Sequence, residues 1–370
     1  MHKRPAVFGL RKFVLCTISF LPIQMAGCDT SADRRDFRGF ALPFNLSSES
    51  LATFPDQSEL DEPLFDDIPG AAGHHAATIA AFPDGELIAA WYSYRGPEEL
   101  DGAAIYTSRR RPDASAWSQP RLEIARGDPV GNPVLFAEGE DLLLFFAVAP
   151  FGWSSAHIEM QRSSDRGMTW SSPIRLPGPI GSNVRFPPIR LHDGRLLLPA
   201  YDDLFHRTMF LTSNDGESWE LMPIVSSGEN GKPIQPSVVE LAGGRLLAVM
   251  RNTAKGWLWV MASDDMALSW SPPADSGFPN PGSAAALHRL ASGHLVLVYN
   301  DSPRERRPLT VALSTDEGKT WPNRMILADG DETYSYPSIT QSPDGMIHIV
   351  YSLARRSIRH VAIDADSIGR

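Results

Sequence analysis

Two arginines and one tyrosine in this sequence have the chemistry to act together on an anionic molecule. Arg251 closes an apolar run, Arg307 lies in a charged loop, and Tyr336 stands just before the last hairpin that the chain predicts. A guanidinium group binds a carboxylate through two parallel hydrogen bonds, and a tyrosine hydroxyl can act as a nucleophile. These residue types favour a ligand that carries a carboxylate.

The elements that must position these residues are indicated by an internal repeat. Four eight-residue segments resemble one another and end in tryptophan: 163–170, 212–219, 263–270 and 314–321. With an earlier, worn copy that ends at Trp117, the tryptophans recur every 49 to 53 residues, a period typical of propellers and solenoids. We expect the third residue of each copy to hydrogen-bond its own turn; these residues are Asp165, Asn214, Asp265 and Asp316.

One copy of the repeat differs at its glycine. Gly167, Gly216 and Gly318 can adopt a positive φ at little cost. Ala267 stands at this position in the third copy. We therefore expect a strained or differently shaped turn there.

Pairs of β-rich runs around glycine turns recur between the tryptophans and predict hairpins. Six pairs occur, at 76–91, 133–147, 189–201, 238–250, 284–299 and 339–351, and the run 358–363 adds a strand. No long helical period appears. The sequence predicts an all-β fold, a six-bladed β-propeller over residues 71–370. Residues 29–70 are interpreted as a tether that includes a strand closing the last blade.

The innermost strands of a propeller converge on its axis, so polar residues at their beginnings are expected to share one funnel. These residues are His75, Asn132, Arg185, Gln235, Asn280 and Tyr336. Plainer roles stay open, because the amides could bond exposed backbone at the strand starts and Tyr336 could be a core tyrosine. Arg251 could likewise pair with a blade carboxylate.

The motif Ser-x-Asp-x-Gly-x-Thr-Trp resembles the Asp box of the sialidase (neuraminidase) superfamily, and the resemblance covers about residues 70–370. It implies a six-bladed β-propeller of the sialidase type. Asp boxes lie on the outer rim of such propellers and also occur in proteins without sialidase chemistry. The activity must therefore be judged from the pocket.

The resemblance also implies roles for individual residues. Sialidases use three arginines on the substrate carboxylate, a tyrosine nucleophile, a glutamate that activates it and an aspartate as acid and base. Arg251 resembles the second arginine, Arg307 the third, and Tyr336 the nucleophile.

The acid and base of that scheme should lie in the loop after Trp91. Glu98, Glu99 and Asp101 all qualify there, and the sequence leaves the choice among them open. Our candidate catalytic residues in this loop are Glu99 and Asp101.

Two positions depart from the family pattern. The position of the first arginine holds His75, and the position of the tyrosine-activating glutamate holds Gln235. A glutamine cannot take a proton from a phenol. The sequence therefore predicts substrate contact without the usual proton machinery, with His75 as a candidate replacement base.

Residues 1–28 have the pattern of a secretory signal. Basic residues precede an apolar stretch that is too short and too interrupted for a membrane span. The stretch ends in Met25-Ala26-Gly27-Cys28, which resembles a bacterial lipobox. We expect lipidation of Cys28 and a periplasmic lipoprotein that Asp29 helps to retain at the inner membrane; plain secretion is the alternative.

Composition narrows the partners. The chain has 34 Lys and Arg against 44 Asp and Glu, a net charge of -10, which argues against a nucleic-acid partner. No Cys/His spacing indicates a zinc site, and no glycine-rich phosphate loop follows a strand. We expect no metal and no cofactor, and a monomer.

Three classes of function are compatible with these observations. The first is an exo-acting, sialidase-like glycoside hydrolase of an acidic or modified sugar in the cell envelope. A variant is a lyase of uronic-acid glycans, in which His75 or Tyr336 takes the proton next to a carboxylate. The second is a glycan-binding propeller without catalysis, and the third is an assembly protein of the envelope.

Overall fold

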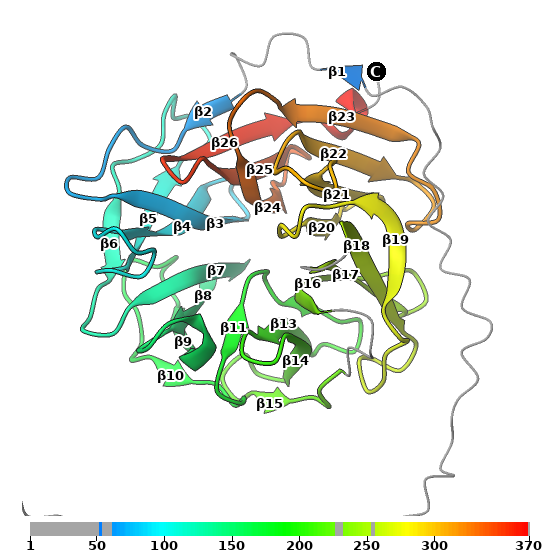
Figure 1. Cartoon of the computed structure of the whole chain (residues 1–370), viewed down its shortest axis with the longest axis horizontal. Helices are drawn as coiled ribbons and strands as arrows, with labels where there is room; N and C mark the ends of the chain where they lie inside the picture. The colour runs from blue at the N-terminus through cyan, green and yellow to red at the C-terminus, as the bar shows by residue number, and fades with distance from the viewer. Residues whose placement is uncertain (1–51, 54–60, 226–231, 253–255, 369–370) are drawn as a thin grey trace, which may run out of the picture. The chain divides into compact units, whose positions relative to one another are not determined.

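The computed structural model describes residues 52–53, 61–225, 232–252 and 256–368. Six sheets stand around a central axis (Figure 1). The first blade contains β3 (Gly73–Ala81), β4 (Leu87–Tyr94), β5 (Ala104–Arg110) and β6 (Arg121–Ile124). The second contains β7 (Val130–Glu138), β8 (Asp141–Val148), β9 (His157–Ser163) and β10 (Ile174–Arg175). The third contains β11 (Ser182–Val184), β12 (Ile189–Arg190), β13 (Leu196–Asp202), β14 (Arg207–Ser213) and β15 (Glu220–Leu221).

The other three blades follow in chain order. The fourth blade contains β16 (Pro233–Glu240), β17 (Leu246–Asn252), β18 (Trp257–Ser263) and β19 (Ala274–Pro279). The fifth contains β20 (Ala286–Arg289), β21 (Leu295–Asn300), β22 (Leu309–Ser314) and β23 (Asn323–Ala328). The last contains β24 (Tyr334–Gln341), β25 (Ile347–Leu353), β26 (Ser357–Ile363) and β2 (Asp61–Pro63). The strand β1 (Ala52–Thr53) pairs in parallel with β23. Two short 3-10 helices, η3 (Trp153–Ser155) and η4 (Ala365–Ser367), complete the described residues. The predicted all-β, six-bladed propeller is confirmed.

The last blade takes its outermost strand from the N-terminal part of the chain. The strand β2 pairs antiparallel with β26, and Glu62 lies opposite His360. The Glu62 carboxylate accepts hydrogen bonds from His360 Nδ1 at 2.9 Å and from Trp117 Nε1 at 3.2 Å. Because Trp117 lies between β5 and β6 of the first blade, this carboxylate also ties the first blade to the last. No described helix is long and apolar enough to cross a membrane. The expected signal segment, Cys28 and most of the tether lie outside the described residues.

The repeat motif forms the predicted turns, stabilised by its aspartate. Asp165 Oδ1 accepts from the backbone N–H of Thr169 at 2.8 Å, and its Oδ2 accepts from the Thr169 hydroxyl at 2.6 Å. In the second copy the expectation for Asn214 is wrong, since the carboxylate of Asp215 makes these bonds, to the N–H groups of Glu217 and Ser218. The second copy of the motif runs from Ser213 to Trp219 and is one residue shorter than the other copies. Aligning the copies by their tryptophans therefore shifts its aspartate by one position.

Ala267 adopts the conformation that its glycine counterparts have. Its φ is 69°, and its N–H donates to the Ser263 hydroxyl at 3.0 Å, as that of Gly167 does to Ser163. The third turn therefore keeps its shape and carries the strain of a left-handed alanine.

The tryptophans of the repeat pack against neighbouring blades. Trp270 stacks on Phe210 with ring centroids 4.4 Å apart, and Trp321 meets Phe278 edge-on at 5.6 Å. Trp321 is fully buried, whereas Trp170 is half-buried. These aromatic contacts join neighbouring blades through side chains.

A β-bulge interrupts the inner strand of four blades at the same point. In each, one residue has a left-handed φ: Ala76 (53°), Asn132 (47°), Gln235 (57°) and Tyr336 (58°). The bulges fall after paired residues such as Ser335 and before pairing resumes at Ser338. Except after Ala76, a proline follows, which has no N–H to leave unpaired in the ladder. The bulge residue in the first blade is thus Ala76; His75 precedes it and still pairs with Tyr92.

Candidate functional site

Tyr336 stands at the centre of a cluster of cations at the beginning of β24. Its ring centroid lies 4.2 Å from that of His75. The guanidinium carbons of three arginines lie near the ring, Arg185 at 5.3 Å, Arg306 at 5.6 Å and Arg251 at 5.8 Å. The structure therefore brings together Tyr336, His75 and Arg251, as the sequence predicts.

Arg251 reaches this cluster from the end of β17. Its Nη1 donates to the carbonyl of Gly282 at 3.0 Å, while its Nε is buried and has no hydrogen-bond partner among the described residues. Asn280 accepts from the N–H of Ser283 at 2.9 Å and so holds the loop that carries Gly282. Asn280 thus supports Arg251, and no described contact joins it to Tyr336.

The arginine of this loop that joins the cluster is Arg306 and not the expected Arg307. Arg307 donates to the carbonyl of Gly330 at 2.8 Å and pairs with Glu305 and Asp331, all in exposed loops. Its neighbour Arg306 faces Tyr336 instead. Adjacent residues of a loop point in different directions, so counting from the following strand could not separate them.

Arg185 is a structural residue in this arrangement. It is 1% exposed, and its Nη2 donates to three main-chain carbonyls, those of Ala77 at 3.0 Å, Pro337 at 3.1 Å and Tyr336. Burial lowers its pKa to about 10, so it stays charged at neutral pH. The expected substrate contact is replaced by a cation that fixes the bulges of β3 and β24 below the Tyr336 ring.

A buried hydrogen-bond network joins Tyr336 to the neighbouring blades. Gln235 Nε2 donates to the hydroxyl of Tyr336 at 3.4 Å and to that of Tyr201 at 3.2 Å. Asn132 Nδ2 donates to Tyr201 at 3.4 Å and to Asn183 Oδ1 at 3.0 Å. Gln235 and Asn132 therefore lie in the expected funnel, where they bond the tyrosines rather than exposed backbone.

The cations change the acidity of Tyr336. Burial would raise the pKa of this phenol, but the charges of Arg251 and Arg306 and the hydrogen bond from Gln235 outweigh it, so the pKa is lowered from its ordinary value. Burial and the charge of Arg355 hold the pKa of His75 well below its ordinary range. The His75 ring is therefore neutral at pH 7. Its Nδ1 bonds the Ser352 hydroxyl at 3.0 Å, and its buried Nε2 has no partner in the part of the chain that the structure describes.

Of the candidate acids in the loop after Trp91, the structure brings only Glu99 to the cluster. One oxygen accepts a hydrogen bond from the Tyr92 hydroxyl, and the other pairs with Arg355 Nη1 at 2.7 Å. Asp101 is exposed and accepts from the N–H of Glu98 at 3.3 Å, which closes its own loop. This geometry does not support the expectation that Asp101 is a catalytic residue.

A further carboxyl group lies at the edge of the cluster. Asp203 is half-buried after β13, and its N–H donates to Gly181 at 2.9 Å. Burial raises its pKa, against the opposing charge of Arg251. The adjacent Asp202 is fully buried and caps its loop through the N–H groups of Leu204 and Phe205.

Sequence reasoning missed Arg306 and Arg355. Arg251 lies near the end of its strand, but the equivalent residue of the last blade is Ser352, and Arg355 lies in the turn two residues after β25. A rule based on strand ends therefore does not find Arg355. For Arg306 the sequence carries no distinguishing signal beside Arg307.

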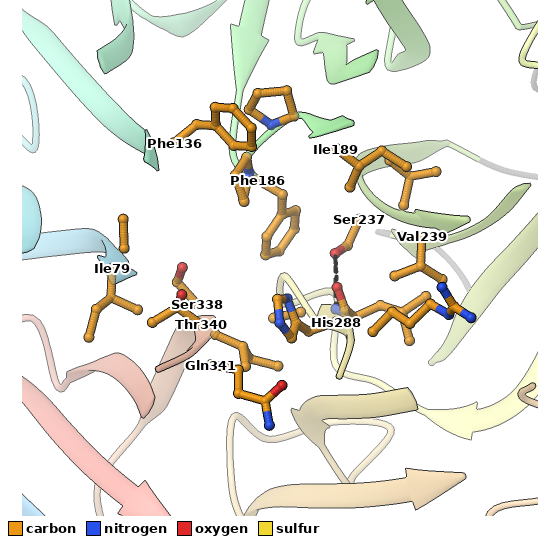
Figure 2. Close-up of a pocket in the computed structure, with 18 of the residues that line it drawn as sticks. Ile79, Phe136, Phe186, Ile189, Ser237, Val239, His288, Ser338, Thr340 and Gln341 are labelled. Atoms are coloured by element: carbon orange, nitrogen blue, oxygen red, sulfur yellow. Dashed lines mark hydrogen bonds between the residues drawn. The ribbon is translucent and has the colours of Figure 1, made fainter. Parts of the chain in front are cut away.

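A separate cavity of about 520 Å³ lies further along the same inner strands. Figure 2 shows Phe136, Phe186 and His288 around it, with a hydrogen bond from the Ser237 hydroxyl to a main-chain carbonyl. Its lining mixes apolar side chains with charged and polar ones, among them Arg190, His288 and Arg289, and includes neither Tyr336 nor the arginines of the cluster. Among the described residues, no group of three or more His, Cys, Asp and Glu could hold a metal ion.

Comparison with known proteins agrees with this architecture. A family model described as a BNR repeat-like domain matches residues 85–349. A sialidase of Micromonospora viridifaciens is 25% identical over 336 residues, which are 76% of this chain and 50% of that protein. A sialidase of Bacteroides fragilis is 22% identical over 313 residues, 70% of this chain and 55% of that protein.

The chain thus spans about half the length of the curated relatives it matches. Among solved structures, the Hadza microbial sialidase Hz136 is similar with a TM-score of 0.71 at 20% identity, over 81% of this chain and 67% of that one. At this identity the likeness concerns the fold. With the six blades, the Asp boxes and the family match taken together, the chain belongs to the BNR repeat-like domain family, within the sialidase superfamily.

Proposed function

We propose that this protein is an exo-acting glycoside hydrolase whose substrate is a sugar with a carboxylate group. The observation that carries the proposal is the position of Tyr336 among cationic side chains, with the guanidinium groups of Arg251 and Arg306 over its ring. These guanidinium groups suit a carboxylate. The names of the similar sialidases support an acidic sugar of that kind.

The proposed reaction has two steps. Arg251 and Arg306 hold the sugar carboxylate, and the Tyr336 oxygen attacks the anomeric carbon while Glu99 gives a proton to the leaving oxygen. A water molecule then attacks the same carbon, gives its proton to Glu99 and releases Tyr336. The configuration at the anomeric carbon is retained.

Ionisation of Tyr336 in this scheme requires no carboxylate base. An ordinary tyrosine, with a pKa near 10, is ionised to only about 0.1% at pH 7. Here two arginines and the Gln235 amide favour the charged form, whereas a glutamate at position 235 would repel it. In this chain the positive charges of Arg251 and Arg306 and the hydrogen bond from Gln235 take the place of a carboxylate that would accept the phenol proton.

The test is a panel of fluorogenic sialosides and uronides with wild type, Arg251→Ala and Tyr336→Phe. We expect turnover of at least one acidic glycoside that both substitutions abolish. Binding that Arg251→Ala removes, without turnover of any glycan, would assign the protein to the class of glycan-binding propellers. Turnover that survives Tyr336→Phe would contradict the proposed nucleophile.

The free Nε2 of His75 favours one second candidate, a lyase acting on uronic-acid glycans. A neutral imidazole can take a proton from the carbon next to a carboxylate, and the His75 ring lies 4.2 Å from Tyr336. A lyase would release an unsaturated product that absorbs ultraviolet light, and a hydrolase would not. The same panel distinguishes the two when absorbance is recorded.

We place this activity in the cell envelope, with a lipid anchor at Cys28. The support is the residue pattern of 1–28, with its basic start, apolar run and terminal Ala26-Gly27-Cys28. Labelling of cells with a fatty-acid probe should mark the wild type and not Cys28→Ser. Equal labelling of both forms, or none in either, would contradict the anchor.

A further inference from the structure

Arg355 lies close to His75 and interacts with it electrostatically. It lies in the turn between β25 and β26, and its carbonyl accepts a hydrogen bond from the N–H of His74 at 2.8 Å. Its guanidinium group pairs with Glu99, and Glu99 in turn accepts from Tyr92. The Tyr92 ring lies 6.0 Å from that of His75. These contacts fix Arg355 at the site.

The backbone at Arg355 is strained. Ala354 and Arg355 have φ values of 50° and 56°, a conformation that turns normally fill with Gly or Asn. A left-handed residue with a side chain costs roughly 1–2 kcal/mol. The fold accepts this cost at a residue whose side chain meets the candidate acid.

The site carries more positive than negative charge before a ligand binds. Arg355 pairs with one close carboxylate, Glu99, which also interacts with Arg306. Arg251 interacts with the next carboxyl group, Asp203, whose pKa is raised by burial. An incoming carboxylate would therefore meet Arg251 and Arg306, for which no ion pair is described, and Arg355, which is already paired.

We propose that Arg355 is the third carboxylate-binding arginine of this site, and that it exchanges Glu99 for the carboxylate of the sugar. This inference rests on the proposed function. When the ligand takes Arg355, Glu99 loses its cation partner and takes up one proton from solvent. Glu99 then carries the proton that the leaving oxygen needs. No other bond forms or breaks in this step.

The surroundings of Glu99 are consistent with this exchange. Tyr92 and Arg355 contact it directly, and the other ionisable groups that interact with it electrostatically are Arg306, Tyr336 and Asp203. Removing Arg355 while adding a ligand carboxylate makes the local field more negative. Both changes favour protonation of Glu99.

Calorimetry of ligand binding tests the exchange. The probes are N-acetylneuraminate and glucuronate, each with its methyl ester as the uncharged control, in buffers of low and high ionisation enthalpy. We expect at least one acid to bind the wild type more tightly than its ester and with proton uptake. Arg355→Gln should weaken acid binding by about 10- to 100-fold, the effect of a lost hydrogen bond to a charged group, and should abolish the uptake.

Three further variants complete the test. Arg356→Gln is the matched control, because Arg356 lies in the same turn and pairs with Glu332 away from the site. Glu99→Gln should bind the acid more tightly than the wild type and without proton uptake, since Arg355 is then free. Arg355→Gly suits the positive φ, so its loss of acid binding would not reflect misfolding.

Two outcomes would overturn the inference and differ in what else they overturn. If Arg355→Gln binds the acid as the wild type does while Arg251→Ala does not, Arg355 only holds Glu99, and the proposed function stands. If the wild type prefers neither acid to its ester, the carboxylate site itself is wrong, and both proposals fall.

Discussion

The Nε2 atom of Gln235 lies 3.4 Å from the hydroxyl of Tyr336 and donates a hydrogen bond to it. A donor at this point favours the phenolate, whereas an ionised carboxylate would repel it. The same amide donates to Tyr201, so it is held from two sides. Tyr336 is thus prepared for ionisation by its environment rather than by a neighbouring base.

Gln235→Leu should raise the pKa of Tyr336. The leucine removes a donor to the charged oxygen, so less phenolate is present at any given pH, and the ascending limb of kcat/KM moves to higher pH. We expect a shift of about one pH unit, since a hydrogen bond to a charged group contributes about 1.5–3 kcal/mol and this one is long. Ultraviolet difference titration, with Tyr336→Phe as the blank, measures the shift without substrate; an unchanged titration would contradict the role of Gln235.

Arg306→Ala and Arg307→Ala should differ sharply although the residues are adjacent. Loss of Arg306 removes a cation that faces Tyr336, and we expect kcat/KM on an acidic glycoside to fall about 10- to 100-fold. Arg307 pairs only with exposed acids, and such pairs contribute about 0–1 kcal/mol. Its variant should stay within about twofold of the wild type. The reverse order would restore Arg307 as the site arginine.

Two glycines of the repeat should respond differently to alanine. Gly167→Ala and Gly216→Ala both place a side chain at positive φ, which costs roughly 1–2 kcal/mol. A Cβ at Gly167 would also lie 2.9 Å from Trp170 and 3.0 Å from Leu142, whereas at Gly216 its nearest neighbour is 3.7 Å away. We expect Gly167→Ala to lower the free energy of unfolding in urea by about 1–3 kcal/mol more than Gly216→Ala. Equal losses would show that the turn at Gly167 relaxes.

The stability of the last blade should fall as the pH drops from about 6.5 to 4. Burial, then the charge of His360, lowers the pKa of His348 to about 4, while the unfolded chain binds the proton near pH 6.5. The unfolded state therefore holds more protons in this range, and acid favours unfolding. His348→Gln should flatten the decline in unfolding free energy. A variant with the same pH slope as the wild type would contradict this.

His192 provides a control of opposite sign. Its side chain pairs with Glu240, which raises the pKa of His192. Protonation of His192 therefore favours the folded state as the pH falls. His192→Gln should make the acid decline steeper where His348→Gln makes it shallower.

Trp321 should matter more for stability than Trp170. Trp321 is fully buried against Phe278, and its replacement by alanine should cost about 3–5 kcal/mol. Trp170 is half-buried and bonds Glu123 through its Nε1 at 2.9 Å. We expect a smaller loss at Trp170, measured by thermal unfolding. Similar melting temperatures for both variants and the wild type would contradict the packing of the blades.

The number and kind of blades can be predicted from the amino-acid sequence alone. The Asp boxes and glycine hairpins are local patterns, because a turn aspartate bonds amides within its own few residues and a hairpin pairs neighbours in the chain. Local bonds of this kind can be predicted from spacing. The same spacing indicated Tyr336, Gln235 and Arg251, which occupy equivalent points at the beginnings or ends of strands.

Which charged side chains meet depends on how distant segments of the chain pack together. Arg306 and Arg307 are adjacent, yet one faces Tyr336 and the other an exposed loop, because loop residues take their direction from the blades around them. Arg185 was expected to face the ligand and instead lies buried below Tyr336, where its donors satisfy carbonyls freed by two bulges. Arg355 meets Glu99 across 256 residues of chain. Such pairings arise from the closure of the ring, which brings the first and last blades together, and no local pattern records them.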